Sequence, residues 1–293
     1  MIKNRTASLT IIIFIYIFAA FCGLYIYNFL RGGYGISYQP ALFIADAAAT
    51  VLVFIFSLIF KNASVYDPYW SVQPPVILGI ALAKVSGTAA NKGAGLLDWL
   101  LFAAVLFWAL RLTANWIYNF KSFEYQDWRY TMLKEKTGRL YPLVNFLGIH
   151  LFPTLVVYLC IVPAVIAVHE GATLNFFSAP FLLLSFIAPV FQGIADIQMH
   201  RFRNDKSPDR GNFIRSGLWK KSRHPNYACE ILMWWGIAWT CFFSMPVSGS
   251  SWFLLCGALI NNLMFLFISI PMAEKRQSQK PGFEEYKKAT RML

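Results

Sequence analysis

Apolar residues in this chain gather into long runs that short polar stretches separate. Each run approaches the 20 or so residues that an α-helix needs to cross the hydrocarbon core of a bilayer. The runs cover residues 9–30, 40–60, 71–90, 95–117, 143–168, 177–199, 225–245 and 250–272. The third run is the weakest, because Lys84 interrupts it. The pattern predicts an all-α, polytopic membrane bundle with about eight transmembrane helices, within a range of about seven to nine.

The composition supports an integral membrane protein. Hydrophobic residues make up 57% of the chain and charged residues only 14%, which is too apolar for an ordinary soluble domain. We therefore expect a multi-pass protein of a bacterial inner membrane or of the endoplasmic reticulum. The five cysteines and four histidines show no ligand spacing, so neither a metal site nor a disulfide framework is expected.

The basic residues predict the orientation in the membrane. The chain has 26 Lys and Arg against 14 Asp and Glu, an excess that is also typical of nucleic-acid-binding proteins. Here, however, 22 of the 26 fall in the two terminal segments and the three loops that share their side of the membrane. Cytoplasmic loops carry this excess in membrane proteins. Both termini are therefore predicted to be cytoplasmic, with the lipid bilayer rather than nucleic acid as the partner.

Polar residues concentrate around the basic loop between the sixth and seventh runs. Gln192, Asp196 and Arg203 share one face of the outgoing helix. A carboxyl group within a membrane span is costly and marks a functional site by default. Asp196 is therefore a candidate binding residue, together with Gln192 and Arg203 on the same helix face.

The helix that follows this loop begins at a proline, the favoured first residue of a helix. Arg223 and Asn226 flank this start, where free amides and the positive dipole end favour phosphate or another anion. Glu230 lies one turn further into the apolar run. We expect an anion site at Arg223 and Asn226, with Glu230 as a buried carboxylate beside it.

Further candidates come from the first half of the chain. Arg111 lies inside the fourth run, and Asn115 follows one turn along on the same face. Asp196 or Glu230 is the expected ion-pair partner of Arg111. Asp67 lies in an aromatic turn at the start of the third run. We interpret this turn either as part of the aromatic belt at the membrane interface or as one wall of a substrate cavity.

The block GLWKKSRHPNYACEILMWWG, residues 217–236, resembles the corresponding block of the DUF1295 family. Arg111-Leu112, residues 127–130 and residues 285–290 resemble further blocks of that family. The resemblance covers the chain from about residue 65 to its end, so residues 1–64 are expected to form N-terminal transmembrane helices and residues 65–293 the family domain. One departure is Cys229, which stands where the family usually has glycine.

The resemblance implies a fold and an activity, since DUF1295 proteins are grouped with the C-terminal domain of steroid 5α-reductases. It implies an NADPH-dependent oxidoreductase that reduces the carbon–carbon double bond of an enone in a lipid or steroid-like substrate. The matching cofactor positions are Gln192, Asp196, Arg203, Asn226, Tyr227 and Glu230. The family uses asparagine at the position of Gln192.

The catalytic candidates are Glu230 and two tyrosines. Glu230 is expected to fix the orientation of the nicotinamide ring. Such a reaction also needs a donor for the developing enolate oxygen, and Tyr118 and Tyr130 are the candidates in the loop between the fourth and fifth runs.

Two alternatives remain open at the level of sequence. Membrane methyltransferases of the same superfamily carry similar blocks and bind S-adenosylmethionine, and Glu274-Lys275-Arg276 resembles their C-terminal region. A protein that binds or transports lipid without chemistry is the second alternative. The extended helix face from Asp196 to Arg203 fits the reductases better than the methyltransferases.

Overall fold

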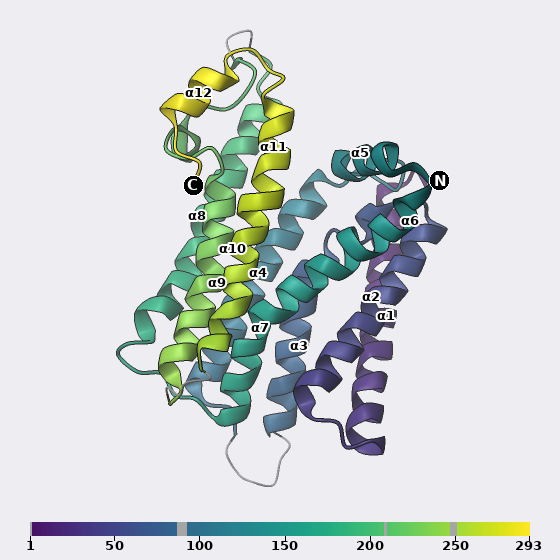
Figure 1. The fold of residues 1–293 in the computed structure, drawn as a ribbon, viewed down its shortest axis with the longest axis vertical. Coiled ribbons are helices and arrows are strands. Elements are labelled where there is room, and N and C mark those ends of the chain that lie inside the picture. The colour runs from purple at the N-terminus through teal and green to yellow at the C-terminus, as the bar shows by residue number, and fades with distance from the viewer. Residues whose placement is uncertain (1, 87–92, 208–209, 247–250) are drawn as a thin grey trace. The chain divides into compact units, whose positions relative to one another are not determined.

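The computed structural model describes residues 2–86, 93–207, 210–246 and 251–293, and the named elements of these residues are all helical (Figure 1). Among these residues, an isolated parallel β-bridge joins Ser222 and Arg291. Helices occupy each of the eight apolar runs, within the described residues. The all-α prediction is confirmed.

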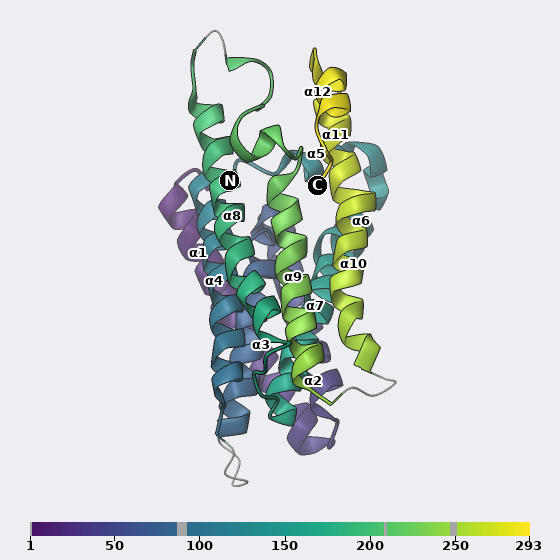
Figure 2. The same ribbon diagram turned by 90° about the vertical axis from the view of Figure 1, so that its left-hand side faces the viewer.

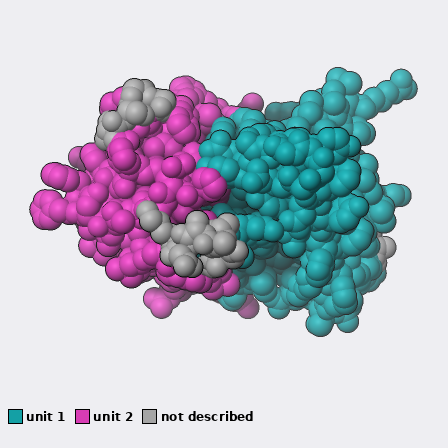
Figure 3. Space-filling model, turned by 90° about the horizontal axis from the view of Figure 1, so that it is seen from below, with its two compact units in different colours: residues 1–84, 112–162 teal, residues 85–111, 163–293 magenta. Residues whose placement is uncertain are grey.

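The chain divides into two compact units, which Figure 3 colours separately. Unit 1 comprises residues 1–84 and 112–162, and unit 2 comprises residues 85–111 and 163–293. The boundaries fall inside α3 (Tyr69–Ser86), α4 (Leu96–Asn119) and α7 (Phe152–Glu170), so each of these helices contributes residues to both units. The boundary predicted from the family resemblance, between residues 64 and 65, stays a prediction.

Unit 1 begins with two long helices that pack side by side, α1 (Arg5–Gly33) and α2 (Tyr38–Ile59). Asn4 caps α1, because its side-chain oxygen accepts a hydrogen bond from the Ala7 amide at 3.0 Å. The other elements of this unit are η1 (Ala63–Val65), α3 (Tyr69–Ser86), α5 (Trp128–Thr137), η2 (Gly138–Leu140), α6 (Tyr141–Val144) and a π-helix, η3 (Asn145–Leu151).

The core of unit 1 is largely aromatic. Ile12 and Ile15 of α1 and Val53 of α2 pack with Tyr66 and Phe123 in one buried cluster. Apolar side chains such as Phe14 and Phe21 cover the exposed face of α1, as is expected of a surface in contact with lipid tails.

Unit 2 is organised around α8 (Ala179–Asn204) and α9 (Pro225–Ser244), which lie side by side (Figure 2). Gly236 permits this close approach. A Cβ atom at that position would lie 2.8 Å from the Phe181 carbonyl oxygen and even nearer to Ser185 Oγ. The remaining elements are η5 (Gly217–Lys220), η6 (Ser251–Leu255), α10 (Cys256–Met264), a second π-helix, η7 (Phe265–Ser269), α11 (Ile270–Gln277) and α12 (Phe283–Ala289).

Six helical stretches of the described residues are long and apolar enough to cross a membrane. They are Arg5–Gly33, Tyr38–Ile59, Leu96–Asn119, Trp128–Glu170, Ala179–Asn204 and Ser251–Gln277. The helices α3 and α9 stand at the other two predicted positions but are not among these six. The chain is thus a multi-pass membrane protein, while its span count of about eight and its orientation stay predictions.

Candidate functional site

The packing of α8 on α9 brings the predicted polar residues of these two helices together. Gln192 and Asp196 are four residues apart on α8, and Asn226 and Glu230 are four residues apart on α9. Residues with this spacing share one face of a helix. The contacts then form two layers, one between Gln192 and Glu230 and one between Asp196 and Asn226.

Glu230 is held by three neutral donors. Trp108 Nε1 and Gln192 Nε2 each donate to Glu230 Oε2 at 2.8 Å, and Trp234 Nε1 donates to Oε1 at 3.0 Å. The side chain is buried, so these donors replace the water that a buried carboxyl group loses. Both oxygens of Glu230 are therefore already engaged by the protein.

Arg111 pairs with Asp196, one of its two expected partners. Arg111 Nη1 lies 2.7 Å from Asp196 Oδ2, and each of the two side chains is only 12% exposed. Asn226 Nδ2 donates to the other oxygen of Asp196 at 3.4 Å. Within the described part of the chain, the buried Arg111 Nε and Nη2 have no hydrogen-bond partner, and neither has the Gln192 side-chain oxygen. Two donors and one acceptor thus remain available beside an ion pair.

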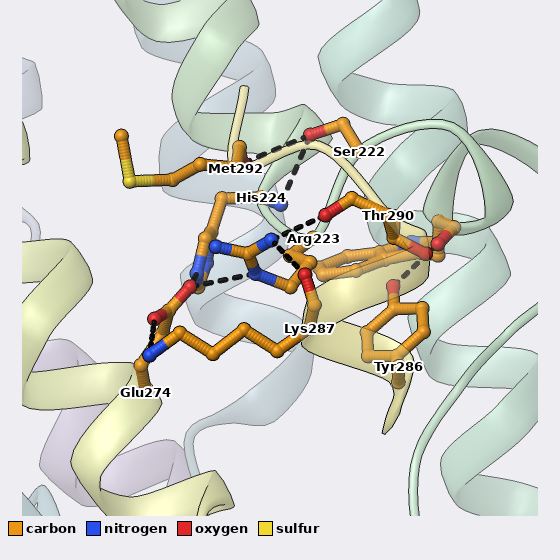
Figure 4. A network of polar contacts seen from close by, with 9 residues as sticks. Ser222, Arg223, His224, Glu274, Tyr286, Lys287, Thr290 and Met292 are labelled. Carbon is orange, nitrogen blue, oxygen red and sulfur yellow. Dashed lines mark hydrogen bonds and ion pairs between the residues drawn. The ribbon is translucent and has the colours of Figure 1, made fainter. Parts of the chain in front are cut away.

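Arg223 contacts the C-terminal region, and its expected contact with a cofactor stays a prediction (Figure 4). Its Nε donates to Glu274 Oε1 at 2.7 Å, and its Nη1 donates to the carbonyl oxygens of Lys287 and Thr290. Lys287 Nζ lies 3.2 Å from Glu274 Oε2. The guanidinium therefore ties the start of α9 to the last residues of the chain.

His224 completes this group of contacts at the N-cap of α9. Its Nε2 lies 3.3 Å from Glu274 Oε1. Burial lowers the pKa of His224, and the Glu274 carboxylate offsets part of this shift. The ring stacks on Tyr227, with centroids 5.4 Å apart and planes 7° apart. Tyr227 thus has one ring face against the histidine, and its expected cofactor contact is untested.

Arg203 lies near the end of α8 and is exposed. Together with Arg210 and the intervening described residues, it lines a polar pocket in unit 2. In the part of the chain that the structure describes, the hydrogen bonds and ion pairs of the Arg111–Asp196 pair do not include Arg203. It is a separate cation on the same helix.

Unit 1 holds the other sequence-predicted residues. Asp67 accepts hydrogen bonds from the Tyr130 hydroxyl and from Trp116 Nε1, the latter at 3.3 Å. Burial raises the pKa of Asp67 to about 6, and the neighbouring Asp127 adds to the shift, whereas Arg129 opposes it. Asp67 and Tyr130 therefore form a hydrogen-bonded pair between the turn before α3 and the first turn of α5.

Tyr118 and Asn115 lie on the part of α4 that belongs to unit 1. The Tyr118 side chain is 61% exposed, and the oxygens of Asn115 face the Asn119 amide. The proposed role of Tyr118 as a donor stays a prediction.

The structure also shows a polar group that the sequence analysis did not single out. Asp46 lies in α2 and is buried. Its Oδ1 accepts a hydrogen bond from the Tyr69 hydroxyl at 3.2 Å, and its Oδ2 accepts one from the Gln73 amide. Asp46 is the one acidic residue in an apolar run of 22 residues, and that isolated carboxyl was the available signal.

Asp46, Tyr69 and Gln73 stand on the wall of a pocket within unit 1. Tyr16 of α1 also lines this pocket. The rest of the lining comes from α1, α2 and α3 and is almost entirely apolar: Ala19, Ala20, Gly23, Leu24, Tyr27, Leu42, Ala45, Ala49, Val72, Val76, Ile77 and Ile80. Binding pockets for small molecules combine such apolar walls with a few placed polar groups. This pocket suits an apolar ligand with one polar end.

Comparison with known proteins places the chain in a family. Over 198 residues it is 28% identical to the uncharacterized protein C594.04c of Schizosaccharomyces pombe, a match that covers 59% of this chain and 56% of that protein. The chain thus spans little more than half the length of that relative. No solved structure matches. Residues 53–290 match the family described as "Protein of unknown function (DUF1295)", so the chain belongs to DUF1295, a family related to steroid 5α-reductase-like membrane proteins.

Proposed function

We propose that this protein is an NADPH-dependent reductase of a carbon–carbon double bond conjugated to a carbonyl group in a lipid or steroid-like substrate. The observation that carries the proposal is the Tyr69 hydroxyl, held by buried Asp46 on the wall of an otherwise apolar pocket. Enone reduction needs a hydrogen-bond donor at the carbonyl oxygen, whereas the apolar remainder of such a substrate needs only an apolar wall.

The residues of unit 2 fit the proposed cofactor. The spare Arg111 Nε and Nη2 are cationic donors suited to a phosphate oxygen, and the spare Gln192 oxygen is an acceptor suited to a carboxamide N–H. Asn226 and Arg203 would extend this contact set at the ends of α9 and α8. NADPH, when bound, supplies a hydride. The chain's own contribution in this unit is to bind and orient.

Tyr69 would stabilise the charge that develops on the substrate by turning its single hydroxyl proton, which it otherwise gives to Asp46 Oδ1, toward the substrate oxygen. When a hydride reaches the β-carbon of an enone, the electron pair of the carbon–carbon double bond moves to join the α-carbon to the carbonyl carbon, and the π pair of the carbonyl group moves onto its oxygen. A hydroxyl donor placed at that oxygen lowers the barrier, and losing one such donor typically costs about 10²–10³ in rate. The α-carbon then takes a proton that comes ultimately from solvent. Tyr69 replaces Tyr118 and Tyr130 in this proposal, because it alone of the three lines the apolar pocket.

The test is NADPH oxidation by the purified protein in detergent, measured against a panel of steroid and linear enones. Tyr69→Phe should lower kcat by about 100-fold. Tyr25→Phe is the matched control, because Tyr25 is a highly exposed tyrosine of α1 in the same unit. Methyl transfer from S-adenosylmethionine with no NADPH oxidation would favour the methyltransferase alternative. Binding of enones with neither reaction would favour a lipid-binding protein.

The proposed cofactor site has its own test. Arg111→Gln should weaken NADPH binding more than tenfold, because a charge-assisted hydrogen bond is worth about 1.5–3 kcal/mol. Lys134→Gln, on the exposed surface of α5 in unit 1, is the control. An unchanged dissociation constant in Arg111→Gln would mean that the guanidinium serves only its ion pair with Asp196.

A further inference from the structure

The buried carboxyl group of Asp46 has neutral partners only. Asp46 is 6% exposed and lies on the wall of the unit 1 pocket. Its two oxygens accept hydrogen bonds from the Tyr69 hydroxyl and the Gln73 amide. In the ranges of the chain that the structure describes, Asp46 belongs to no ion pair. A carboxylate in apolar surroundings is costly unless a cation pairs with it. A positively charged ligand in the pocket would supply that partner.

Gln73 adds a second acceptor to the same wall. The residue lines the pocket and is 4% exposed. Its Nε2 donates to Asp46 Oδ2, whereas its side-chain oxygen is buried and has no hydrogen-bond partner among the described residues. A carboxylate can accept about four hydrogen bonds, so Asp46 also has acceptor capacity left. The carbonyl oxygen of an enone only accepts hydrogen bonds and would leave the Gln73 oxygen unpaired. A primary ammonium group has three donors and suits both residues.

The apolar part of the pocket extends away from these polar groups between α1 and α3. At one end the rings of Tyr16 and Tyr69 pack edge to face, with centroids 5.5 Å apart. The lining continues along the two helices to Tyr27 and Ile80. From Gln73 to Ile80 the helix α3 rises by about 10 Å, which leaves room for an alkyl chain of medium length. Tyrosine rings also attract ammonium groups through their electron-rich faces, and three tyrosines line this pocket.

We propose that this pocket binds a lipid-like primary amine. The ammonium group pairs with Asp46 and donates to the Gln73 oxygen, while the alkyl chain lies between α1 and α3. The inference goes beyond the proposed reductase activity, because it rests on an unpaired carboxyl group and an unpaired acceptor and on no reaction. A general attraction for cations is not expected of this chain, whose formal net charge is +12. Binding of an amine would therefore be specific to the pocket.

The test compares decylamine with decanol, which has the same alkyl chain and a neutral polar end. Isothermal titration calorimetry of the purified protein in detergent at neutral pH gives both dissociation constants, without NADPH and without an enone. Both ligands enter detergent micelles through the same chain, so the difference between them reports on the polar end. We expect the wild-type protein to bind decylamine more tightly by about tenfold or more, because charge-assisted hydrogen bonds are stronger than neutral ones.

Two variants and a control place the amine in the pocket. Asp46→Asn removes the charge and keeps the shape of the side chain, so it should abolish the preference for decylamine. Asp98→Asn is the matched control, because Asp98 is a buried carboxyl group in the first turn of α4, in unit 2. Ala20→Phe is the second variant, for use if Asp46→Asn does not fold. Ala20 lines the pocket at an exposed position of α1, and a bulkier side chain there should weaken decylamine binding.

Each outcome decides for or against the inference. Loss of the preference for decylamine in Asp46→Asn, with wild-type values in Asp98→Asn, supports it. Equal affinities of the wild-type protein for decylamine and decanol overturn it, and so does a preference that survives in Asp46→Asn. If Asp46→Asn does not fold, wild-type affinity for decylamine in Ala20→Phe overturns it. A protein that binds decylamine at Asp46 and reduces no enone would keep this inference and lose the reductase proposal.

Discussion

At the scale of single residues, the two units treat their buried carboxyl groups differently. Asp196 has a guanidinium partner, whereas Glu230 has three neutral N–H donors and Asp46 has a phenol and an amide. The ion pairs formed among the described residues do not include Glu230 or Asp46. Each carboxyl group is thus positioned by a different set of partners, and the effect of changing it follows from those partners.

Glu230→Gln tests the neutral-donor arrangement. The amide keeps one acceptor oxygen but places an N–H₂ group against a donor that now contacts the other carboxylate oxygen. At least one buried donor loses its partner, so we expect a loss of stability of about 1–3 kcal/mol. The measurement is the thermal midpoint of the purified protein in detergent. Glu284→Gln, at an exposed position of α12, is the control. Equal midpoints for wild type and Glu230→Gln would show that these donors do not depend on the carboxylate.

Asp67 should make stability depend on pH. Its pKa is raised from an ordinary 3.8 to about 6, chiefly by burial. The folded protein therefore binds a proton more tightly than the unfolded chain. The stabilisation from protonated Asp67 is complete below about pH 4 and is lost as the pH rises through about 6.

Asp67→Asn removes this titration. We expect the difference in thermal midpoint between wild type and Asp67→Asn to move against the wild type as the pH rises from 4 to 7. Groups that titrate in both proteins cancel in the difference. A constant difference over this range would contradict the raised pKa.

At the scale of elements, the apolar runs predicted where the helices lie but not how they pack. The prediction was good because a run of about 20 apolar residues has few alternatives to a helix in lipid. The helix α12 was not anticipated, because its seven residues carry four charges and only a few apolar side chains. The π-helix at Asn145–Leu151 was also missed, since a single-turn change of hydrogen bonding leaves no clear signature in the residue pattern.

The candidate site was predicted in part, for a related reason. Spacing along α8 and α9 places Gln192, Asp196, Asn226 and Glu230 on matching faces, and the contacts confirm that these faces meet. Arg111 pairs with Asp196 and not with Glu230, and this pairing depends on how far α4 is shifted along α8. No local pattern records that offset. The involvement of Trp108 and Trp234 with Glu230 depends on it as well.

Gly236→Ala tests the packing of α8 on α9. The new Cβ would lie 2.8 Å from the Phe181 carbonyl oxygen, which is backbone and cannot rotate away. Overpacking of this kind costs typically about 1–3 kcal/mol, and we expect a lower thermal midpoint. Gly32→Ala is the control, because a Cβ on that glycine of α1 meets no atom within 4 Å. Similar midpoints for both variants would mean that the two helices separate easily at this point.

At the scale of the whole molecule, the described helices and the distribution of charge support different conclusions. Six stretches have the length and composition of membrane spans, and this alone makes the protein multi-pass. Orientation follows only from the loops. Eight of the 26 basic residues lie from residue 201 to residue 223, in the last turn of α8 and the loop that joins it to α9. Short loops with this excess stay in the cytoplasm.

The predicted orientation is open to a direct test by reporter fusions. Both termini and the loops after Arg139 and Arg210 should report a cytoplasmic position, because these segments hold most of the basic residues. A fusion at His169–Gly171, between α7 and α8, should report the opposite side, because α7 and α8 each cross the membrane in this scheme. Moving lysines into the 169–175 segment should weaken or invert the signal, since basic residues set the orientation. A cytoplasmic signal at His169–Gly171 in the unaltered protein would contradict the eight-span arrangement and place the end of α8 with Arg203, and the loop that follows it with Arg223, on the side away from NADPH.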